Sequence, residues 1–264
     1  MFAEKRPKGY DDPEFVHLIN QLYANVRKNC HAMLELREGI TMLDVGSDVG
    51  DDTISFAQAH NLNVVGVETS HELVNFANQQ AQEAGVADRV EHTYIADSNL
   101  PFADEHFDIC HVDRMFQHLD DPKPLLTEMA RVLKPGGQML WSESDQGTIA
   151  LDCTQQDTWW QLLQCRSRQF ANPFAGRQLL RYAHWLGLEN VKVQAFPVII
   201  TDYDLAGYFI QLAELEDQAL REGLLTEQDL VAWREGIDRL ERESDGSGFA
   251  SINVMVVRGH KPEA

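Results

Sequence analysis

The sequence predicts an α/β fold, in which a mostly parallel seven-stranded sheet with an antiparallel last strand carries helices on both faces. Between residues 42 and 145, short apolar runs alternate with longer amphipathic segments. Such alternation requires parallel strands joined by right-handed crossovers, with helices covering the sheet. Near the end of the chain, residues 249–257 form one more apolar run, which we expect to be the antiparallel last strand.

The first half of the chain supplies the parallel strands. It begins with a helix over about residues 12–38, where apolar residues recur at helical spacing until Gly39 ends it. The first strand contains Met42, and the elements after it are expected as helix 51–60, strand 63–68, helix 70–84, strand 90–95, strand 107–113, helix 122–133 and strand 138–145. Pro135-Gly136-Gly137 is expected to stop the last of these helices in a tight turn. Trp141, in the fifth strand, is expected to pack in the core.

The second half is less regular. Its expected elements are helix 155–171, loop 172–177, helix 177–186, strand 191–200, and helices 202–221 and 226–242. Thr226-Glu-Gln-Asp229 opens the last helix as a variant of the capping box. These two helices form an insertion, at about 203–244, between strands six and seven. We expect the insertion to serve as a substrate lid or as a dimer contact.

The turn after the first strand carries an unusual charge. Residues 42–53 read Met-Leu-Asp-Val-Gly-Ser-Asp-Val-Gly-Asp-Asp-Thr, an apolar strand that runs through a glycine turn into a helix. Small residues let a ligand approach the backbone closely, and the helix start offers unpaired N–H groups. Asp48, Asp51 and Asp52 would repel a pyrophosphate at this place, so a cationic ligand fits better.

This segment resembles motif I of the class I S-adenosylmethionine (SAM) methyltransferases, whose loop usually reads Asp/Glu-x-Gly-x-Gly-x-Gly. Asp44, Gly46 and Gly50 match that loop, while Asp48 replaces its middle glycine. The resemblance implies a Rossmann-like fold, SAM as the cofactor and S-adenosylhomocysteine (SAH) as its product. Within this segment it implies cofactor contacts from Asp44, Gly46, Asp48, Gly50 and Thr53.

Two further strand ends support the resemblance. Glu68-Thr69 closes the second apolar run, where a carboxylate can accept both ribose hydroxyls. Asp97-Ser98 closes the third, a position that in the family lies beside the adenine amino group. The stretch 99–108 is similar to the family signature Leu-Pro-Phe-x-Asp-x-x-Phe-Asp. The whole pattern is typical of the type 11 and ubiquinone/menaquinone biosynthesis methyltransferases, which act on small molecules.

Other site residues follow from position in that family. Asp113 and Arg114, just after the fourth strand, are expected to flank the methionyl part of SAM. Arg27, on the first helix, either pairs with the cofactor's carboxylate or is a solvated helix charge. His118 is the candidate catalytic base, with a helix-capping or surface role as the alternative. The candidate substrate contacts are Arg166, Asn172 and Arg177, for which core packing is the alternative.

Composition restricts the partners. The chain has 42 acidic and 22 basic residues, a net charge of −20, which opposes binding to nucleic acid and to anionic membranes. It shows no signal peptide and no apolar stretch long enough to span a bilayer, so we expect a cytoplasmic protein. The 4 cysteines and 10 histidines show no metal-ligand spacing, and no metal is expected.

The predicted protein is therefore one SAM-methyltransferase domain over residues 1–264, with an N-terminal cap helix (1–38), a cofactor-binding half (39–150) and a substrate half (151–264). It would transfer a methyl group to an O, N or C atom of a small molecule, and it could form a homodimer through the helical insertion. One alternative is a methyltransferase fold that has lost or repurposed methyl transfer, as a binding or regulatory protein or a non-methyl catalyst. A nicotinamide oxidoreductase is disfavoured because the chain lacks a Gly-x-Gly-x-x-Gly fingerprint.

Overall fold

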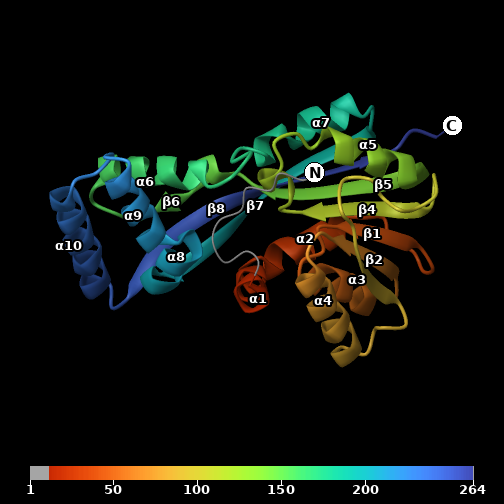
Figure 1. Cartoon of the computed structure of the whole chain (residues 1–264), viewed down its shortest axis with the longest axis horizontal. Helices are drawn as coiled ribbons and strands as arrows, with labels where there is room; N and C mark the ends of the chain where they lie inside the picture. The colour runs from red at the N-terminus through yellow and green to blue at the C-terminus, as the bar shows by residue number, and fades with distance from the viewer. Residues whose placement is uncertain (1–11, 264) are drawn as a thin grey trace.

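The computed structural model describes residues 12–263 and confirms the α/β fold (Figure 1). Its sheet has the strand order β3-β2-β1-β4-β5-β8-β6, with β7 paired to the free side of β8. The five strands β1 to β5 are parallel, and β8 runs antiparallel to β5, β6 and β7. The strand bounds are β1 Thr41–Val45, β2 Asn63–Glu68, β3 Val90–Tyr94, β4 Phe107–Asp113, β5 Leu133–Ser144, β6 Ala150–Leu151, β7 Glu189–Asp202 and β8 Ser247–His260.

Helices cover both faces of this sheet, as predicted. On one face lie α2 Ala24–Met33, α3 Asp51–His60 and α4 His71–Glu83, and on the other lie α5 Lys123–Val132 and α7 Leu179–Trp185 (Figure 1). Alternate strand residues feed two separate cores, since Met42 packs with the first face and Leu43 with the second. Trp141 is fully buried in the second core, which confirms its packing role.

The predicted N-terminal helix was wrong in its length and continuity. The structure has two helices, α1 Pro13–Leu22 and α2 Ala24–Met33, and residues 34–38 are not helical. The break falls at Tyr23, whose side chain is buried, with its hydroxyl 3.2 Å from the Ser144 hydroxyl. This tertiary contact, formed at the end of β5, prevails over the apolar periodicity that runs on through residues 12–38.

Two more predicted elements differ. Pro135-Gly136-Gly137 lies within β5, where the pairing with β4 skips from Leu133 to Gln138 and so makes an irregularity of the expected turn. The predicted strands six and seven correspond to β7 and β8, which are longer and form a two-stranded ribbon. A short β6, not predicted, continues the pairing along β8 beyond β5 and makes the sheet eight-stranded.

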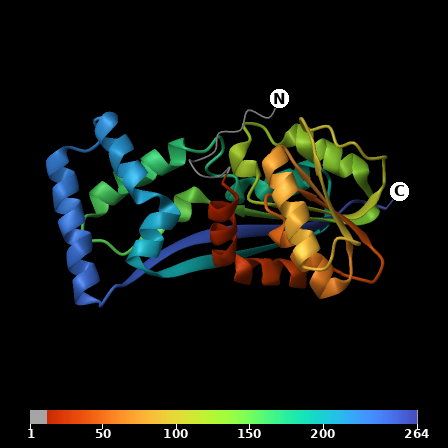
Figure 2. The same ribbon diagram turned by 60° about the horizontal axis from the view of Figure 1, so that its bottom comes forward.

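The insertion contains three helices instead of two: α8 Tyr203–Ile210, α9 Leu212–Arg221 and α10 Glu227–Glu243. The predicted 202–221 helix breaks at Gln211, which adopts a left-handed backbone with φ 56°. These helices and α6 Gln156–Arg168 form a lobe around the far end of the β7–β8 ribbon (Figure 2). Trp159 of α6 stacks on Trp233 of α10 at 6.2 Å, and one hydrophobic cluster runs from this pair to the face of the sheet that carries α2.

Candidate functional site

The loop between β1 and α3 is a tight turn at the carboxyl end of the sheet. Gly46, Asp48 and Gly50 all have left-handed backbones, with φ of 77°, 45° and 85°. The N–H groups of Gly46 and Ser47 donate to the carbonyl of Val67 on β2, at 2.9 and 3.1 Å. Aspartate tolerates this conformation better than most residues other than glycine, so Asp48 can replace a glycine here.

The space beneath this loop is filled by His92 of β3. A Cβ on Gly66 would lie 2.5 Å from the His92 ring, and one on Gly50 would lie 3.0 Å from it. The Thr53 hydroxyl donates to the Gly50 carbonyl and lies 2.8 Å from His92 Nε2. Thr53 is fully buried, so its hydroxyl supports the loop from inside the protein and does not face the open edge. Burial lowers the pKa of His92 to about 4, which keeps its ring neutral.

Glu68 lies beside the loop, as expected of neighbouring parallel strands. Its side chain is buried, and one carboxylate oxygen accepts hydrogen bonds from the Thr69 backbone and hydroxyl at 2.6 and 3.0 Å. Its other oxygen lies 3.4 Å from the Asp48 backbone nitrogen. After β3, Asp97 and Ser98 are half-buried, and Asp97 accepts two hydrogen bonds from Asn99 at 2.8 Å.

The two acidic residues at the start of α3 are bound by side chains of α1 and α2. Asp51 lies 3.0 Å from His17 Nδ1 and accepts a hydrogen bond from Asn20 at 2.9 Å. Arg27 donates to Asp52, so the structure places it in an ion pair with this helix start and not in solvent. Burial opposes the charge of Asp52, but Arg27, His111 and Arg114 together outweigh burial and lower the pKa of that carboxyl.

Asp44 forms a buried pair with His111 of β4, with 2.6 Å between Oδ1 and Nδ1. Neither side chain is exposed by more than 3%. Burial disfavours the imidazolium, but the carboxylates of Asp44 and Asp52 raise the pKa of His111. Asp44 thus faces a histidine inside the sheet, a partner that no local sequence pattern predicts.

Asp113 is the last residue of β4, and Arg114 follows it at the carboxyl end of the sheet. Arg114 has φ 51°, its Nε donates to Asp113 at 2.7 Å, and its guanidinium lies 3.9 Å above the Tyr23 ring. Its Nη2 also donates to Asn20 of α1. Burial acts to lower the pKa of Arg114, but Asp113, Tyr23 and Asp48 together outweigh burial and raise it. The N-terminal helices are thereby attached to the end of β4 as well as to α3.

Glu143, near the end of β5, is a buried carboxyl that was missed at the sequence level. It is fully buried and accepts hydrogen bonds from the backbone of Gln117 and of Ser144, both at 3.1 Å. Burial, with Asp113 close by, raises the pKa of this carboxyl well above its ordinary value. Glu143 thus anchors η1 Phe116–His118, which carries the candidate base. The run of polar residues at the end of the fifth strand, 142–145, is the sequence feature that could have identified Glu143 as a site residue.

The candidate substrate residues have different surroundings. Asn172 exchanges amide hydrogen bonds with Gln178 at 3.1 and 2.9 Å, and Arg177 donates two hydrogen bonds to Asp145 at 2.5 and 2.7 Å. Arg166 and His118 are both buried, and they contact the same ring, that of Phe170. The Arg166 guanidinium lies 4.9 Å and the His118 ring 5.6 Å from its centroid.

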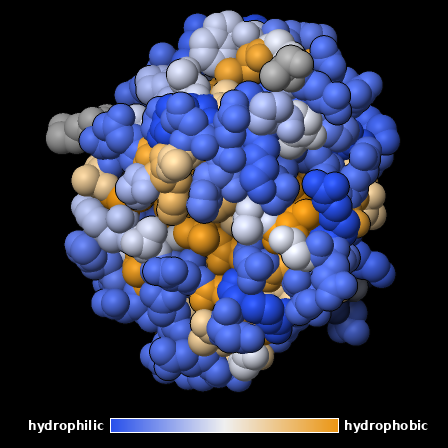
Figure 3. Space-filling model, turned by 90° about the vertical axis from the view of Figure 1, so that its right-hand side faces the viewer, coloured by the Kyte–Doolittle hydropathy of each residue, from blue (hydrophilic) through white to orange (hydrophobic). Residues whose placement is uncertain are grey.

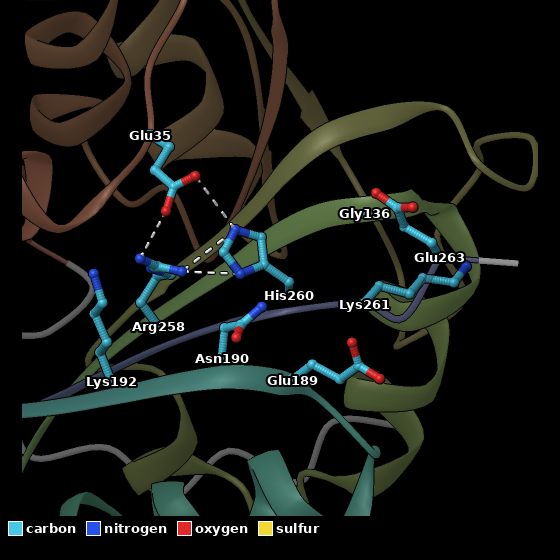
Figure 4. Close-up of a pocket in the computed structure, with 9 residues that line it drawn as sticks. All are labelled: Glu35, Gly136, Glu189, Asn190, Lys192, Arg258, His260, Lys261 and Glu263. Carbon is cyan, nitrogen blue, oxygen red and sulfur yellow. Dashed lines mark hydrogen bonds and ion pairs between the residues drawn. The ribbon is translucent and has the colours of Figure 1, made fainter.

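The cavity at the opposite end of the sheet is not part of this site. It measures about 770 Å³ and is lined by the start of β7 and the end of β8, with none of the predicted site residues (Figure 4). In its lining, Arg258 binds Glu35 at 3.0 Å, and Lys261 donates to two carbonyls at the end of α5 and the start of β5. Hydrophilic side chains cover most of this end of the molecule (Figure 3).

A second cavity, of about 610 Å³, lies between α1 and the insertion, where Phe15 and Tyr208 meet at 5.5 Å between ring centroids. Among residues 12–263, no His, Cys, Asp and Glu side chains gather in a group of three that could hold a metal ion. Over the same range, no helix has both the length and the hydrophobicity needed to cross a bilayer.

Comparisons with known proteins agree with this geometry. Residues 43–141 match the family model of a methyltransferase domain. The chain is 32% identical over 139 residues to the 27-O-demethylrifamycin SV methyltransferase of Amycolatopsis mediterranei, a match that covers 53% of this chain and 51% of that protein. It is 26% identical over 216 residues to the demethylmenaquinone methyltransferase of Bacillus velezensis, covering 73% and 89%.

Among solved structures, the phosphoethanolamine N-methyltransferase 2 of Haemonchus contortus in complex with SAM has a TM-score of 0.56 and 19% identity, covering 91% of this chain and 53% of that one. At this identity the likeness shows the fold alone. The chain spans about half the length of several curated relatives that it matches, including the first two, at 51% and 58%.

Proposed function

We propose that this chain is a class I SAM-dependent methyltransferase that transfers a methyl group from SAM to an O, N or C atom of a small molecule. The match of residues 43–141 to the methyltransferase-domain family model supports this proposal. The main support is the close approach of Glu68 to the loop between β1 and α3, in which the Glu68 carboxylate lies 3.4 Å from the Asp48 backbone nitrogen. Loop and carboxylate lie together at the carboxyl ends of parallel strands, the edge at which ligands of such sheets bind.

The residues present fit this cofactor. We propose that Glu68 and Thr69 hold the ribose, that Asp97 and Ser98 contact the adenine, and that the backbone of Gly46, Asp48 and Gly50 lies against the sulfur-bearing part. A Cβ on Gly46 would lie 3.0 Å from Met115, so the loop has no room for a larger residue there. Asp44 and Asp113 are carboxylates beside this edge, and they favour a ligand with sulfonium and ammonium charges.

We propose indirect roles for the other predicted cofactor residues. Arg27 holds the start of α3 through Asp52, and Thr53 holds the loop through His92. Arg114 attaches Asp113 to α1 through Asn20. In each case the side chain fixes the position of a group that faces the cofactor.

SAM, when bound, supplies a methyl group that is already activated on a sulfonium. The chain then has to orient the acceptor in line with that methyl and keep water away, which α1 and α2 do by covering α3 and the end of β4. His118 is the proposed base for an acidic acceptor. Its place on η1 is set by the buried Glu143 through the Gln117 backbone.

The names of the relatives support a small-molecule acceptor, since one is a 27-O-demethylrifamycin SV methyltransferase and another a demethylmenaquinone methyltransferase. They differ in acceptor, so no atom type is assigned. A homodimer through α8–α10 remains part of the proposal. The second candidate function, a methyltransferase fold used for binding or for non-methyl catalysis, rests on the substitution of Asp48 for glycine. The left-handed backbone of Asp48 shows that the substitution leaves the turn intact.

The direct test is thermal unfolding with SAM, SAH and NAD in turn. A ligand at a hundred times its dissociation constant adds about 2.7 kcal/mol to the stability, so SAM and SAH should raise the melting temperature and NAD should not. The variant Glu68→Ala should lose most of this shift, whereas Trp141→Phe, which alters only the core, should keep it. Absence of a shift with both sulfur nucleosides would reject the methyltransferase proposal.

A further inference from the structure

Arg166 of α6 is a buried cation without a carboxylate. Its exposure is 2%, and its hydrogen bond is to the neutral side chain of Gln169, at 3.1 Å from Nη1. Its Nε is buried and has no hydrogen-bond partner among the residues that the structure describes. Within residues 12–263, no Asp or Glu lies within ion-pair distance of this guanidinium.

Such an arrangement costs stability. A charge removed from water is compensated only by a paired charge and a full set of hydrogen bonds. Arg258 shows how this chain meets the requirement elsewhere. It is 1% exposed, and it donates to Glu35 at 3.0 Å and to the Met33 carbonyl at 3.2 Å. Arg166 has no equivalent partner in the described part of the chain. An apolar residue at this position would therefore stabilise the fold at least as well as Arg166 does.

The position of Arg166 connects it with the proposed site. The Phe170 ring contacts both Arg166 and His118, and His118 is on η1, which closely follows Asp113 and Arg114 in the chain. The helix that carries Arg166 also packs against η2 Gln146–Thr148, where the buried Oε1 of Gln146 has no hydrogen-bond partner within residues 12–263. A donor and an acceptor are thus both unsatisfied on two elements that contact each other, an arrangement suited to binding a polar group of a ligand.

We propose that Arg166 recognises an oxygen anion of the methyl acceptor, a carboxylate or an ionised hydroxyl, while Phe170 contacts the acceptor's apolar frame. The proposal rests on the methyltransferase function proposed above and adds the charge class of the substrate. In a chain of net charge −20, an anionic acceptor needs a dedicated cation, because the average field repels it. A planar guanidinium that can bind two oxygens is suited to this task.

The first measurement compares Arg166→Met with Arg168→Met without ligand. Arg168 is on the same helix, half exposed and paired with Glu222, and so provides a matched control. Thermal unfolding of Arg166→Met should occur at the same or a higher temperature than that of the unsubstituted protein, because methionine removes the buried charge and keeps the apolar volume. A clear fall in the melting temperature of Arg166→Met alone would assign the guanidinium to the core and reject the proposal.

The second measurement uses benzoate and its neutral isostere benzamide as probes, titrated by NMR into the protein with and without saturating SAH. The unsubstituted protein and Arg168→Met should bind benzoate about tenfold or more tightly than benzamide, the effect of one charge-assisted contact. Arg166→Met should lose that preference. Equal affinities for the two probes, no binding of either, or an unchanged preference in Arg166→Met would overturn the proposal. Because SAH binding is measured separately, its absence would reject the general function, whereas SAH binding without an anion preference would reject only the role of Arg166.

Discussion

At the scale of single residues, the site depends on which side chains lie under the loop as much as on which face a ligand. Gly50 and Gly66 leave room for the His92 ring, and Thr53 holds that ring to the loop. Asp48 has the left-handed backbone that the usual glycine would have, and its backbone nitrogen is 3.4 Å from Glu68. The departure from the family pattern is therefore accommodated by local geometry.

His92 gives a testable dependence of stability on pH. Burial lowers its pKa from 6.5 to about 4, so between these values the unfolded chain binds a proton that the folded chain does not. This contribution to stability is complete above pH 6.5 and is lost as the pH falls towards 4. We compare the unsubstituted protein with His92→Gln by urea denaturation at pH 7, 6 and 5. The unfolding free energy of His92→Gln should fall less steeply with falling pH, and the two slopes should differ by up to about 1.4 kcal/mol per pH unit.

His31, whose pKa burial also lowers to about 4, is present in both proteins and cancels from that comparison. Parallel plots of unfolding free energy against pH for the two proteins would contradict this prediction, because they would show that His92 binds a proton equally well in the folded and the unfolded chain.

At the scale of elements, local sequence patterns predicted the structure correctly where a side chain hydrogen-bonds to backbone only a few residues away. The capping box at Thr226 is confirmed, since Thr226 accepts from the Asp229 backbone at 3.2 Å and Asp229 accepts from the Thr226 backbone at 2.8 Å. Periodicity failed at Tyr23 and Gln211, where the helices break. At Tyr23, the contacts with Ser144 and Arg114 are distant in sequence and leave no trace in local spacing.

Removing the cap of α10 should cost a predictable amount. Thr226→Ala deletes one N-cap acceptor, so urea denaturation should show a loss of about 1 kcal/mol in unfolding free energy. Thr127→Ala is the control, because Thr127 is exposed inside α5 and alanine has the higher helix propensity. If Thr226→Ala and Thr127→Ala lose the same unfolding free energy, the loss is that of any exposed threonine, and the capping box adds no stability.

At the scale of the whole molecule, the protein joins a sheet with its ligand edge to a lobe of α6 and α8–α10 on a long ribbon. The predicted cofactor residues lie between positions 27 and 114, and the insertion supplies none of them. The hydrophobic cluster nevertheless extends from Met42 in the sheet through Trp159 to Trp233 in the insertion. The lobe is thus packed against the rest of the fold by a continuous core.

Deleting residues 203–244 tests how far the two parts depend on each other. SAH binding should remain measurable by calorimetry, because its proposed contacts precede the deletion, and substrate use should change. The melting temperature should fall, because the loss of Trp233 and Leu215 exposes Trp159. A chain that fails to fold would show that the insertion is part of the core needed by the cofactor half.

The sequence by itself determined the alternation of strands and helices, the order of the loop, Glu68 and Asp97, and therefore the edge at which they meet. These follow from local periodicity and from the rule that parallel strands bring their carboxyl ends together. Only the tertiary structure decided that Arg177 pairs with Asp145, that Asn172 pairs with Gln178, and that Arg166 is buried with no carboxylate of the described chain to pair with it. The same is true of Glu143 and of the pair of Asp44 with His111. The charge and partner of a side chain at such a site depend on residues far away in the sequence, and only folding brings those residues together.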